Sequence, residues 1–344
     1  MKNNPESGIF HTINQAERSS RDTLESIGQR FAFPVHEKIR NMSEDETLEV
    51  SAENQDKISK KDLVRVTLQS LRTAWEKTIE LQINEIRQKA IDKSELKQGT
   101  DFATKVDIEG ENTIKEIFIN AFQDQLNIAG EEHEAHQGKV GSDITVRIDP
   151  IDGTESMKFG KPDWGIMVGI YKGQPANEQQ IASAVFYPER KKILLNVEGQ
   201  GIFTTDLETN IAQEIKPVQE QNELTEMIVQ FYENIEERPN DQTFADLKGQ
   251  LTTRQARLRS SPASCIDVLE AIETNGKRAM IINGGYKTVD FIPHAGLEKL
   301  GYKLYNWQGQ ELKADSQELT DQRIIIVPPG KAGQDIIEMC KNIQ

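Results

Sequence analysis

The chain has 344 residues, which is enough to bury one large hydrophobic core or two smaller ones. Its 41 Lys and Arg residues against 56 Asp and Glu residues give a formal charge of −15, which opposes binding to a nucleic-acid polymer. The hydrophobic fraction of 36% and the mean hydropathy of −0.61 are low for a compact globule. We therefore expect part of the chain to be solvated rather than packed.

The cysteines and the apolar segments indicate a compartment. Cys265 and Cys340 have no CxxC spacing and no partners for a disulfide framework, which is typical of a reducing compartment, so we predict a cytoplasmic protein. The N-terminus lacks a signal-peptide pattern, and no run of about 18 apolar residues occurs. We expect no association with a membrane.

The first sixty residues differ in composition from those that follow. Residues 1–60 are rich in Glu, Ser, Asn, Gln and Arg, and their apolar residues follow no sustained period. We interpret them as a weakly structured or peripheral extension that could form an interface, a lid or a disordered tail.

Two helices are predicted next. Apolar residues recur at steps of three or four from Val64 to Ala90, which is the stripe of one amphipathic helix. After Gly99, a short extended segment is expected to lead into a second stripe over residues 114–122. Asp107 then lies near the start of the second helix.

The remaining elements mix strands and helices. Residues 144–148 alternate as a strand does, and Pro150 and Gly153 are expected to end that strand in a turn. Further strands are predicted up to about residue 205, then helices at 264–274 and 294–300, strands at 278–284 and 323–327, and a C-terminal helix. Because no repeat and no regular βαβ alternation occurs, we predict a layered α/β or α+β sandwich with halves at 61–212 and 213–344.

The segment IDPIDGTES, residues 148–156, carries the strongest chemical signal. Asp149 and Asp152 stand three residues apart at a strand end, and the Ile151 carbonyl lies in the same bend. Hard cations such as Mg²⁺ prefer oxygen ligands of this kind. Asp-Pro and Asp-Gly are also ordinary turn dipeptides, so the segment alone leaves a purely structural interpretation open. An EF-hand is excluded, because its carboxylates occupy alternate positions.

The same segment suits an anion. Gly153 permits a close approach of the backbone, and a helix that begins at Thr154 would direct free N–H groups at a phosphate.

Three further motifs raise the odds of a metal site, because they occur in a particular order around DPIDGT. They are DFATKVD at 101–107, GEE at 130–132 and VD at 289–290. In this order the chain resembles the inositol monophosphatase-like phosphatases, from about Leu63 to the C-terminus. The resemblance implies a sandwich of alternating helix, sheet, helix, sheet and helix layers.

The resemblance also implies a ligand set for two or three Mg²⁺ ions. Glu131, Asp149 and the Ile151 carbonyl match the ligands of the first ion, and Asp149, Asp152 and Asp290 match those of the second. Glu131 also lies where a third, weaker ion is held.

For catalysis, the resemblance assigns Asp107 and Thr154 to the attacking water, with Glu131 beside it. Gly153 and Thr154 match the backbone donors for phosphate. The implied mechanism is in-line attack by a magnesium-activated water, without a phosphoenzyme.

The chain departs from the family pattern around the substrate. Asp290 lacks the usual tryptophan before it and the A-A-G after it. Asn283 replaces a glutamate that contacts inositol, and Ser260 and Ser261 stand where the family has G-[ST]-A. The residues aligned with the substrate are therefore Gly153, Thr154, Ser260, Ser261, Asn283 and Asp290.

The expected activity is hydrolysis of a small phosphorylated polyol, sugar or nucleotide, with inhibition by lithium. Fructose-bisphosphatase-like and bisphosphate-nucleotidase-like activities are alternatives, and a catalytically silent binder of phosphorylated ligands is an alternative of another class. The expected partner is the small phosphorylated substrate, and family members are often homodimers.

Other reactive residues have simpler interpretations. His133 and His136 lack the HExxH spacing of a zinc site, which favours a surface loop. Cys265 could act as a nucleophile with His294, but a helical cysteine beside apolar residues is more often part of the core. Arg259, with Arg257, could bind a second phosphate, because a guanidinium matches phosphate geometry.

Overall fold

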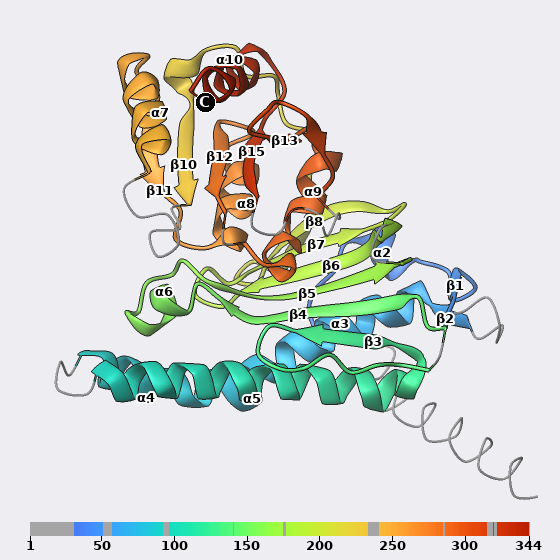
Figure 1. Ribbon diagram of the computed structural model, residues 1–344. Coiled ribbons are helices and arrows are strands. Elements are labelled where there is room, and N and C mark those ends of the chain that lie inside the picture. The colour runs from blue at the N-terminus through green and yellow to red at the C-terminus, as the bar shows by residue number, and fades with distance from the viewer. Residues whose placement is uncertain are drawn as a thin grey trace, which may run out of the picture.

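The computed structural model describes residues 31–50, 57–91, 96–139, 141–174, 177–232, 241–284, 286–314, 319 and 322–343. These residues form five stacked layers of helices and sheets, visible from bottom to top in Figure 1. The layered sandwich expected from the sequence is therefore confirmed.

The first layer is helical and packs on one face of the larger sheet. It contains α3 (Lys60–Ala74), the π-helical turn η1 (Trp75–Ile79), α4 (Glu80–Ile91) and α5 (Leu96–Phe122). The stripe predicted over residues 64–90 thus forms one helical run that a π-turn interrupts, and Leu68, Leu71 and Ile86 lie in the core beneath the sheet.

The second helix differs from the prediction. Residues 101–107, expected to begin as an extended segment, lie within α5, which begins at Leu96, so Asp107 lies in the middle of the helix. This helix packs closely against strand β4 at Gly110. A Cβ on Gly110 would lie 3.4 Å from Pro150 Cβ, which shows how closely helix and strand approach.

The second layer is a seven-stranded sheet in the order β3-β4-β5-β6-β7-β8-β9. Its strands are β3 (Asn127–Gly130), β4 (Ile144–Asp152), β5 (Gly165–Lys172), β6 (Gln179–Tyr187), β7 (Lys192–Val197), β8 (Gly201–Asp206) and β9 (Ile211–Glu214). Only the β3–β4 pair is parallel. Successive side chains alternate between faces, so Leu195 faces α3–α5 while Leu194 faces the next layer.

The fourth layer is a six-stranded mixed sheet in the order β11-β10-β12-β15-β13-β14. Its strands are β10 (Ile228–Tyr232), β11 (Arg257–Ser260), β12 (Arg278–Asn283), β13 (Lys303–Asn306), β14 (Glu311–Leu312) and β15 (Arg323–Val327). The predicted strands at 278–284 and 323–327 are confirmed. The boundary predicted between the two halves, after residue 212, falls inside β9. The division of the chain into two halves stays a prediction.

Helices fill the space between the sheets and cover the outer face. Between the sheets lie α8 (Ser264–Glu273), α9 (His294–Lys299) and the 3₁₀ turn η6 (Thr288–Phe291), and on the outside lie α7 (Gln242–Thr253) and α10 (Lys331–Lys341). Strand β12 contributes side chains to the cores on both faces of its sheet. Met280 and Ile282 face α8, whereas Ala279 and Ile281 face α7 and α10. Short elements complete the described chain: η3 (Gln123–Gln125), α6 (Thr154–Lys158) and η5 (Leu224–Glu226).

Part of the predicted extension is packed, contrary to expectation. Residues 31–50 and 57–59 contain α2 (Glu37–Arg40), β1 (Thr47–Glu49) and β2 (Lys57–Ser59). Ile39 and Ile58 are buried in the core, and the Phe33 ring lies 5.2 Å from that of Phe186. Its sparse apolar residues are spread over short elements that join the core of the larger sheet, so the sequence shows no sustained period. Residues 1–30 lie outside the described part of the chain.

None of the helices in the described ranges combines the length and apolar character that a membrane span requires.

Candidate metal centre

The end of β4 brings two carboxylates to the same side of the strand. Residues three apart in a regular strand point to opposite faces. Here Asp149 pairs with Met167 of β5 while Asp152 pairs with Gly165, so β4 gains one residue in a bulge. The extra residue compensates for the odd spacing. The strand therefore continues through Pro150 to Asp152, beyond the turn predicted at Pro150.

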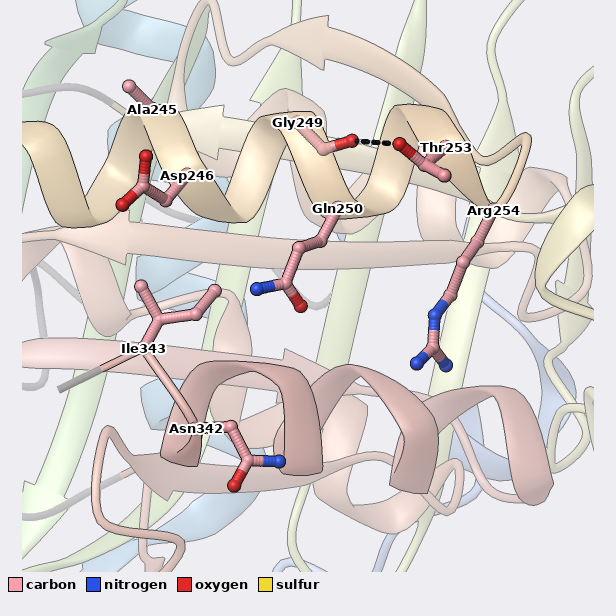
Figure 2. A pocket seen from close by; sticks show the side chains of 8 residues that line it. All are labelled: Ala245, Asp246, Gly249, Gln250, Thr253, Arg254, Asn342 and Ile343. Carbon is pink, nitrogen blue, oxygen red and sulfur yellow. Dashed lines mark hydrogen bonds between the residues drawn. The ribbon is translucent and has the colours of Figure 1, made fainter.

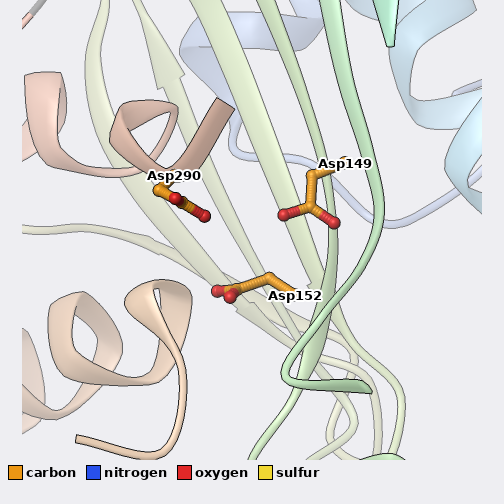
Figure 3. Close-up of side chains that lie close together, drawn as sticks. All are labelled: Asp149, Asp152 and Asp290. Atoms are coloured by element: carbon orange, nitrogen blue, oxygen red, sulfur yellow. The ribbon is translucent and has the colours of Figure 1, made fainter. Parts of the chain in front are cut away.

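Asp290 joins this pair from η6, more than a hundred residues later in the chain. Asp149, Asp152 and Asp290 each offer an oxygen, and these oxygens lie within 4.8 Å of one another. Figure 3 shows the three side chains converging from β4 and η6. The Lys287 backbone N–H donates to Asp290 Oδ2 at 2.6 Å, which fixes that carboxylate in place.

The start of α8 holds the carboxylate of Asp152. The Ser264 hydroxyl donates to Asp152 Oδ2 at 2.8 Å, and the Cys265 backbone N–H donates to the same atom at 2.6 Å. The N-terminus of a helix favours negative charge. The sequence did not single out Ser264. Cys265 itself is completely buried, as the core interpretation predicted.

Glu131 lies near the site but outside the group of three aspartates, because β3 runs parallel to β4 and ends at Gly130, opposite Ile148. Its Oε1 accepts a hydrogen bond from Lys287 Nζ at 2.7 Å. The Lys287 side chain is 61% exposed and that of Glu131 is 22% exposed. Nothing in the sequence pointed to Lys287.

Glu111 supports the GEE segment and was also missed. Its carboxylate is buried, accepts the Glu132 backbone N–H at 2.8 Å and contacts His133 Nδ1 at 3.0 Å. A Cβ on Gly130 would lie 2.0 Å from Glu111 Cδ, so a side chain at this position would have to displace the Glu111 carboxylate. Asp107 and Glu111 stand one helical turn apart on α5, a spacing that could have revealed both.

The histidines form no metal site within the described ranges. His133 pairs with Glu111, whereas His136 Nε2 lies 3.9 Å from Asp124. The group of candidate ligands that the described residues form contains no histidine. This agrees with the surface-loop interpretation.

Asp107 and Thr154, the residues aligned with water activation, have different surroundings. Asp107 is buried, and its Oδ1 has no hydrogen-bond partner in the described structure. Burial, and then the charges of Glu132, Glu131 and Glu111, raise the pKa of Asp107 to about 8. The Thr154 hydroxyl donates to the Ile151 carbonyl at 2.9 Å.

The carboxylates strain one another electrostatically. Burial raises the pKa of Asp149 well above its ordinary value, and the negative charge of Glu131 is the next largest cause. The pKa of Asp290 rises for the same reason, with Asp152 as the next cause. Burial also raises the pKa of Asp152, although the hydrogen bonds from α8 oppose this. A divalent cation would relieve this repulsion, and an oxygen-only donor set fits Mg²⁺.

Gly153 forms the turn into α6 and can only be glycine. Its φ of +91° lies in the left-handed region, and a Cβ would lie 2.8 Å from the Asp163 carbonyl oxygen. Helix α6 begins at Thr154, as predicted.

The residues aligned with the substrate are largely engaged by the protein itself. Asn283 is 2% exposed and its Nδ2 donates to Asp241 at 3.2 Å. The Ser261 hydroxyl donates to Asp267 at 2.5 Å, while Ser260 is exposed at the end of β11.

Arg259 is also paired with a residue of the protein. Its Nη1 lies 3.1 Å and 3.2 Å from the two carboxylate oxygens of Glu270, which Arg190 and Arg278 also contact. This ion-pair network weakens the hypothesis that Arg259 binds a second phosphate.

A surface hollow lies elsewhere, between α7 and the end of α10 (Figure 2). It measures about 740 Å³ and is lined by Ala245, Asp246, Gly249, Gln250, Thr253, Arg254, Asn342 and Ile343. The six-stranded sheet separates these outer helices from the carboxylates, so the hollow is not part of the metal centre.

Comparison with known proteins places this geometry in context. The profile described as the inositol monophosphatase family matches residues 60–343. A fructose-1,6-bisphosphatase/inositol-1-monophosphatase of Aquifex aeolicus is 35% identical over 109 residues, which cover 32% of this chain and 39% of that relative. The Nus factor SuhB of Pasteurella multocida is 31% identical over 117 residues, covering 34% of this chain and 41% of that relative. The matched part thus spans about two fifths of each curated relative.

Solved structures share the fold. Inositol monophosphatase II of Staphylococcus aureus superimposes with a TM-score of 0.60 at 16% identity, covering 80% of this chain and 92% of that one.

Proposed function

Because the chain belongs to the inositol monophosphatase family, we propose that it is a metal-dependent phosphatase that hydrolyses a small phosphate monoester. The observation that carries the proposal is the convergence of Asp149, Asp152 and Asp290, with oxygens within 4.8 Å of one another and no histidine or cysteine among them. Buried carboxylates this close repel one another unless a cation compensates their charge or a proton neutralises one of them.

We assign the cation to these residues and to Glu131 and the Ile151 carbonyl. Bound Mg²⁺, as two or three ions, would lower the pKa of a water molecule and neutralise charge on the phosphate oxygens. The bulge in β4 directs Asp149 and Asp152 to one side, and Ser264 and Cys265 hold Asp152 in its orientation.

The remaining residues position phosphate and water. The turn at Gly153 and the first N–H groups of α6 would bind the phosphate, because the N–H groups of a helix's first turn have no partner within the helix. Asp107 Oδ1, which has no partner in the described structure, would accept a hydrogen bond from the attacking water. The Thr154 hydroxyl, now bonded to Ile151, would orient that water by exchanging partners.

The substrate belongs to the polyol, sugar or nucleotide phosphates. A phosphate-release screen should compare inositol 1-phosphate, fructose 1,6-bisphosphate and adenosine 3′,5′-bisphosphate, each with Mg²⁺ and with EDTA. We expect release from at least one compound with Mg²⁺ and none with EDTA. Release from none of a broad panel of such esters, with Mg²⁺ present, would contradict the proposal.

Lithium inhibition, a homodimer and a cytoplasmic location complete the proposal, together with a small phosphorylated substrate as the partner. Lithium should reduce the released phosphate in the same screen, and light scattering on the purified chain measures its mass in solution.

A second candidate is a binder of phosphorylated ligands without turnover. Two observations favour it: one relative is named a Nus factor, and residues 289–293 differ from the family pattern around Asp290. Calorimetry separates the two functions, because a silent binder should take up ligand without metal and release no phosphate.

A further inference from the structure

Lys287 is the basic residue that contacts the metal centre most directly. It precedes η6 and makes two contacts with predicted ligands: its backbone N–H donates to Asp290 at 2.6 Å, and its Nζ donates to Glu131 Oε1 at 2.7 Å. The first contact positions Asp290. The second places a positive charge on Glu131.

The charges around this ammonium group are mostly negative. Glu131, Glu132 and Asp290 all act on Lys287, with Asp290 and Glu131 themselves close to Asp152 and Asp149. His133 is a second basic group near Glu132, but its ring nitrogen already contacts the Glu111 carboxylate. Lys287 therefore supplies a large share of the local positive charge.

An ammonium group and a divalent ion cannot occupy the same carboxylate lone pair. A hydrogen bond of 2.7 Å places Nζ on Oε1, one of the two Glu131 oxygens that could bind an ion, and sets its positive charge beside that carboxylate. The Lys287 side chain is 61% exposed, so its flexible stem can move the ammonium into water. Displacement is thus sterically simple.

We propose that Lys287 is a built-in counter-ion that competes with the divalent metal for Glu131, so that metal binding there requires release of the ammonium group. This inference rests on the proposed metal centre. Lys287 weakens metal binding both by occupying the carboxylate and by repelling a like charge, and it keeps the metal-free site from carrying an unbalanced carboxylate at Glu131.

Titration of Mn²⁺ into the chain tests this, with free Mn²⁺ measured by electron paramagnetic resonance. The variants are Lys287→Met, Glu131→Gln and the double variant, which form a double-mutant cycle. We expect Lys287→Met to tighten the binding of the Mn²⁺ ion at Glu131 by about fivefold to tenfold at low salt. The gain should disappear in the Glu131→Gln background.

Lys277→Met is the matched control. Lys277 pairs with Glu226 at 2.8 Å and its side chain is 50% exposed, but it lies before β12, at the opposite end of that strand from η6. It should leave Mn²⁺ binding unchanged. Lys287→Gln serves as a second variant if the methionine form does not fold.

Unchanged or weaker Mn²⁺ binding in folded Lys287→Met would overturn the inference while leaving the metal centre intact. A gain that persists in the Glu131→Gln background would also overturn it, because competition for Glu131 would not be its cause. If no variant, nor the unaltered chain, binds Mn²⁺, both the inference and the proposed metal centre fail.

Discussion

The two sides of the site differ in how their polar groups are satisfied. On the metal side, three aspartates lie within 4.8 Å of one another, and Asp107 Oδ1 has no partner in the described structure. On the substrate side, Asn283 bonds to Asp241 and Arg259 bonds to Glu270. The metal side holds close negative charges that a ligand from outside would compensate, whereas these substrate-side groups are paired within the protein.

This difference predicts which side of the site gains stability when a cation binds. Clustered buried carboxylates cost free energy until a cation neutralises them, so the metal side should gain stability on loading. An internally paired network gains nothing from a cation. The following predictions test this contrast, from the largest expected effect to the smallest.

Removal of a charge at the centre of the metal side should have the largest effect. Asp149→Asn should lower the phosphate-release rate by about a hundredfold or more with Mg²⁺, because it removes a shared ligand. The same variant should melt at a higher temperature in EDTA, because it removes a buried charge whose pKa is raised. Asp246→Asn, in the outer helix α7, is the control and should change neither measurement.

A side chain at Gly153 should disrupt the turn that positions phosphate. Gly153→Ala adds a Cβ 2.8 Å from the Asp163 carbonyl at a φ of +91°, and we expect a loss of about 2–4 kcal/mol in unfolding free energy. Gly199→Ala has a similar φ of +77° but meets nothing within 4 Å, so it isolates the backbone strain. Equal losses in urea melts of both variants would show that the contact with Asp163 is unimportant.

Asp107 should make the metal-free chain less stable as pH rises. Its pKa is about 8 in the folded chain against 3.8 in the unfolded chain, so the folded chain binds the extra proton between these values. Its stabilising contribution is complete below about pH 4 and is lost as pH rises through about 8, with a slope of at most about 1.4 kcal/mol per unit. Urea melts in EDTA should show a shallower pH dependence for Asp107→Asn. An unaltered slope would mean that Asp107 carries no unusual proton.

Loss of the Ser264 hydroxyl should have the smallest effect. Ser264→Ala removes one of two donors to Asp152 Oδ2, while the Cys265 N–H remains. We expect Mn²⁺ affinity to fall by about tenfold, as for other groups that orient a ligand. Thr274→Ala, at the C-terminal end of α8, should leave the Mn²⁺ affinity unchanged. Equal affinities for Ser264→Ala and the unaltered chain would show that Cys265 suffices.

The local motif could be interpreted from sequence because its parts are neighbours. Asp149, Asp152 and Gly153 lie within five residues, and strand end, turn and helix start are all encoded there. The prediction erred only on the length of β4, because a bulge allows Pro150 to stay inside the strand. Asp290, expected from motif order, was placed beside the pair by the packing of η6 against β4.

Residues that act through space carry no such signal. Glu111 was missed because a glutamate in a helix is ordinary until Gly130 is found against it, and Lys287 because its partner Glu131 is distant in sequence. The packed residues 31–50 were missed because their apolar side chains lie on short elements that join the core of the larger sheet, which leaves no sustained period in the sequence.

The sequence by itself determined the acidic character, several of the later strands and helices and the two β4 carboxylates, because propensity, charge and short motifs depend on neighbouring residues. Only the tertiary structure decided that a bulge turns Asp149 and Asp152 to one side, that Asp290 completes the group and that Lys287 lies on Glu131. Those outcomes depend on how layers pack, since contacts between residues distant in the chain are set by the shape and burial of whole elements.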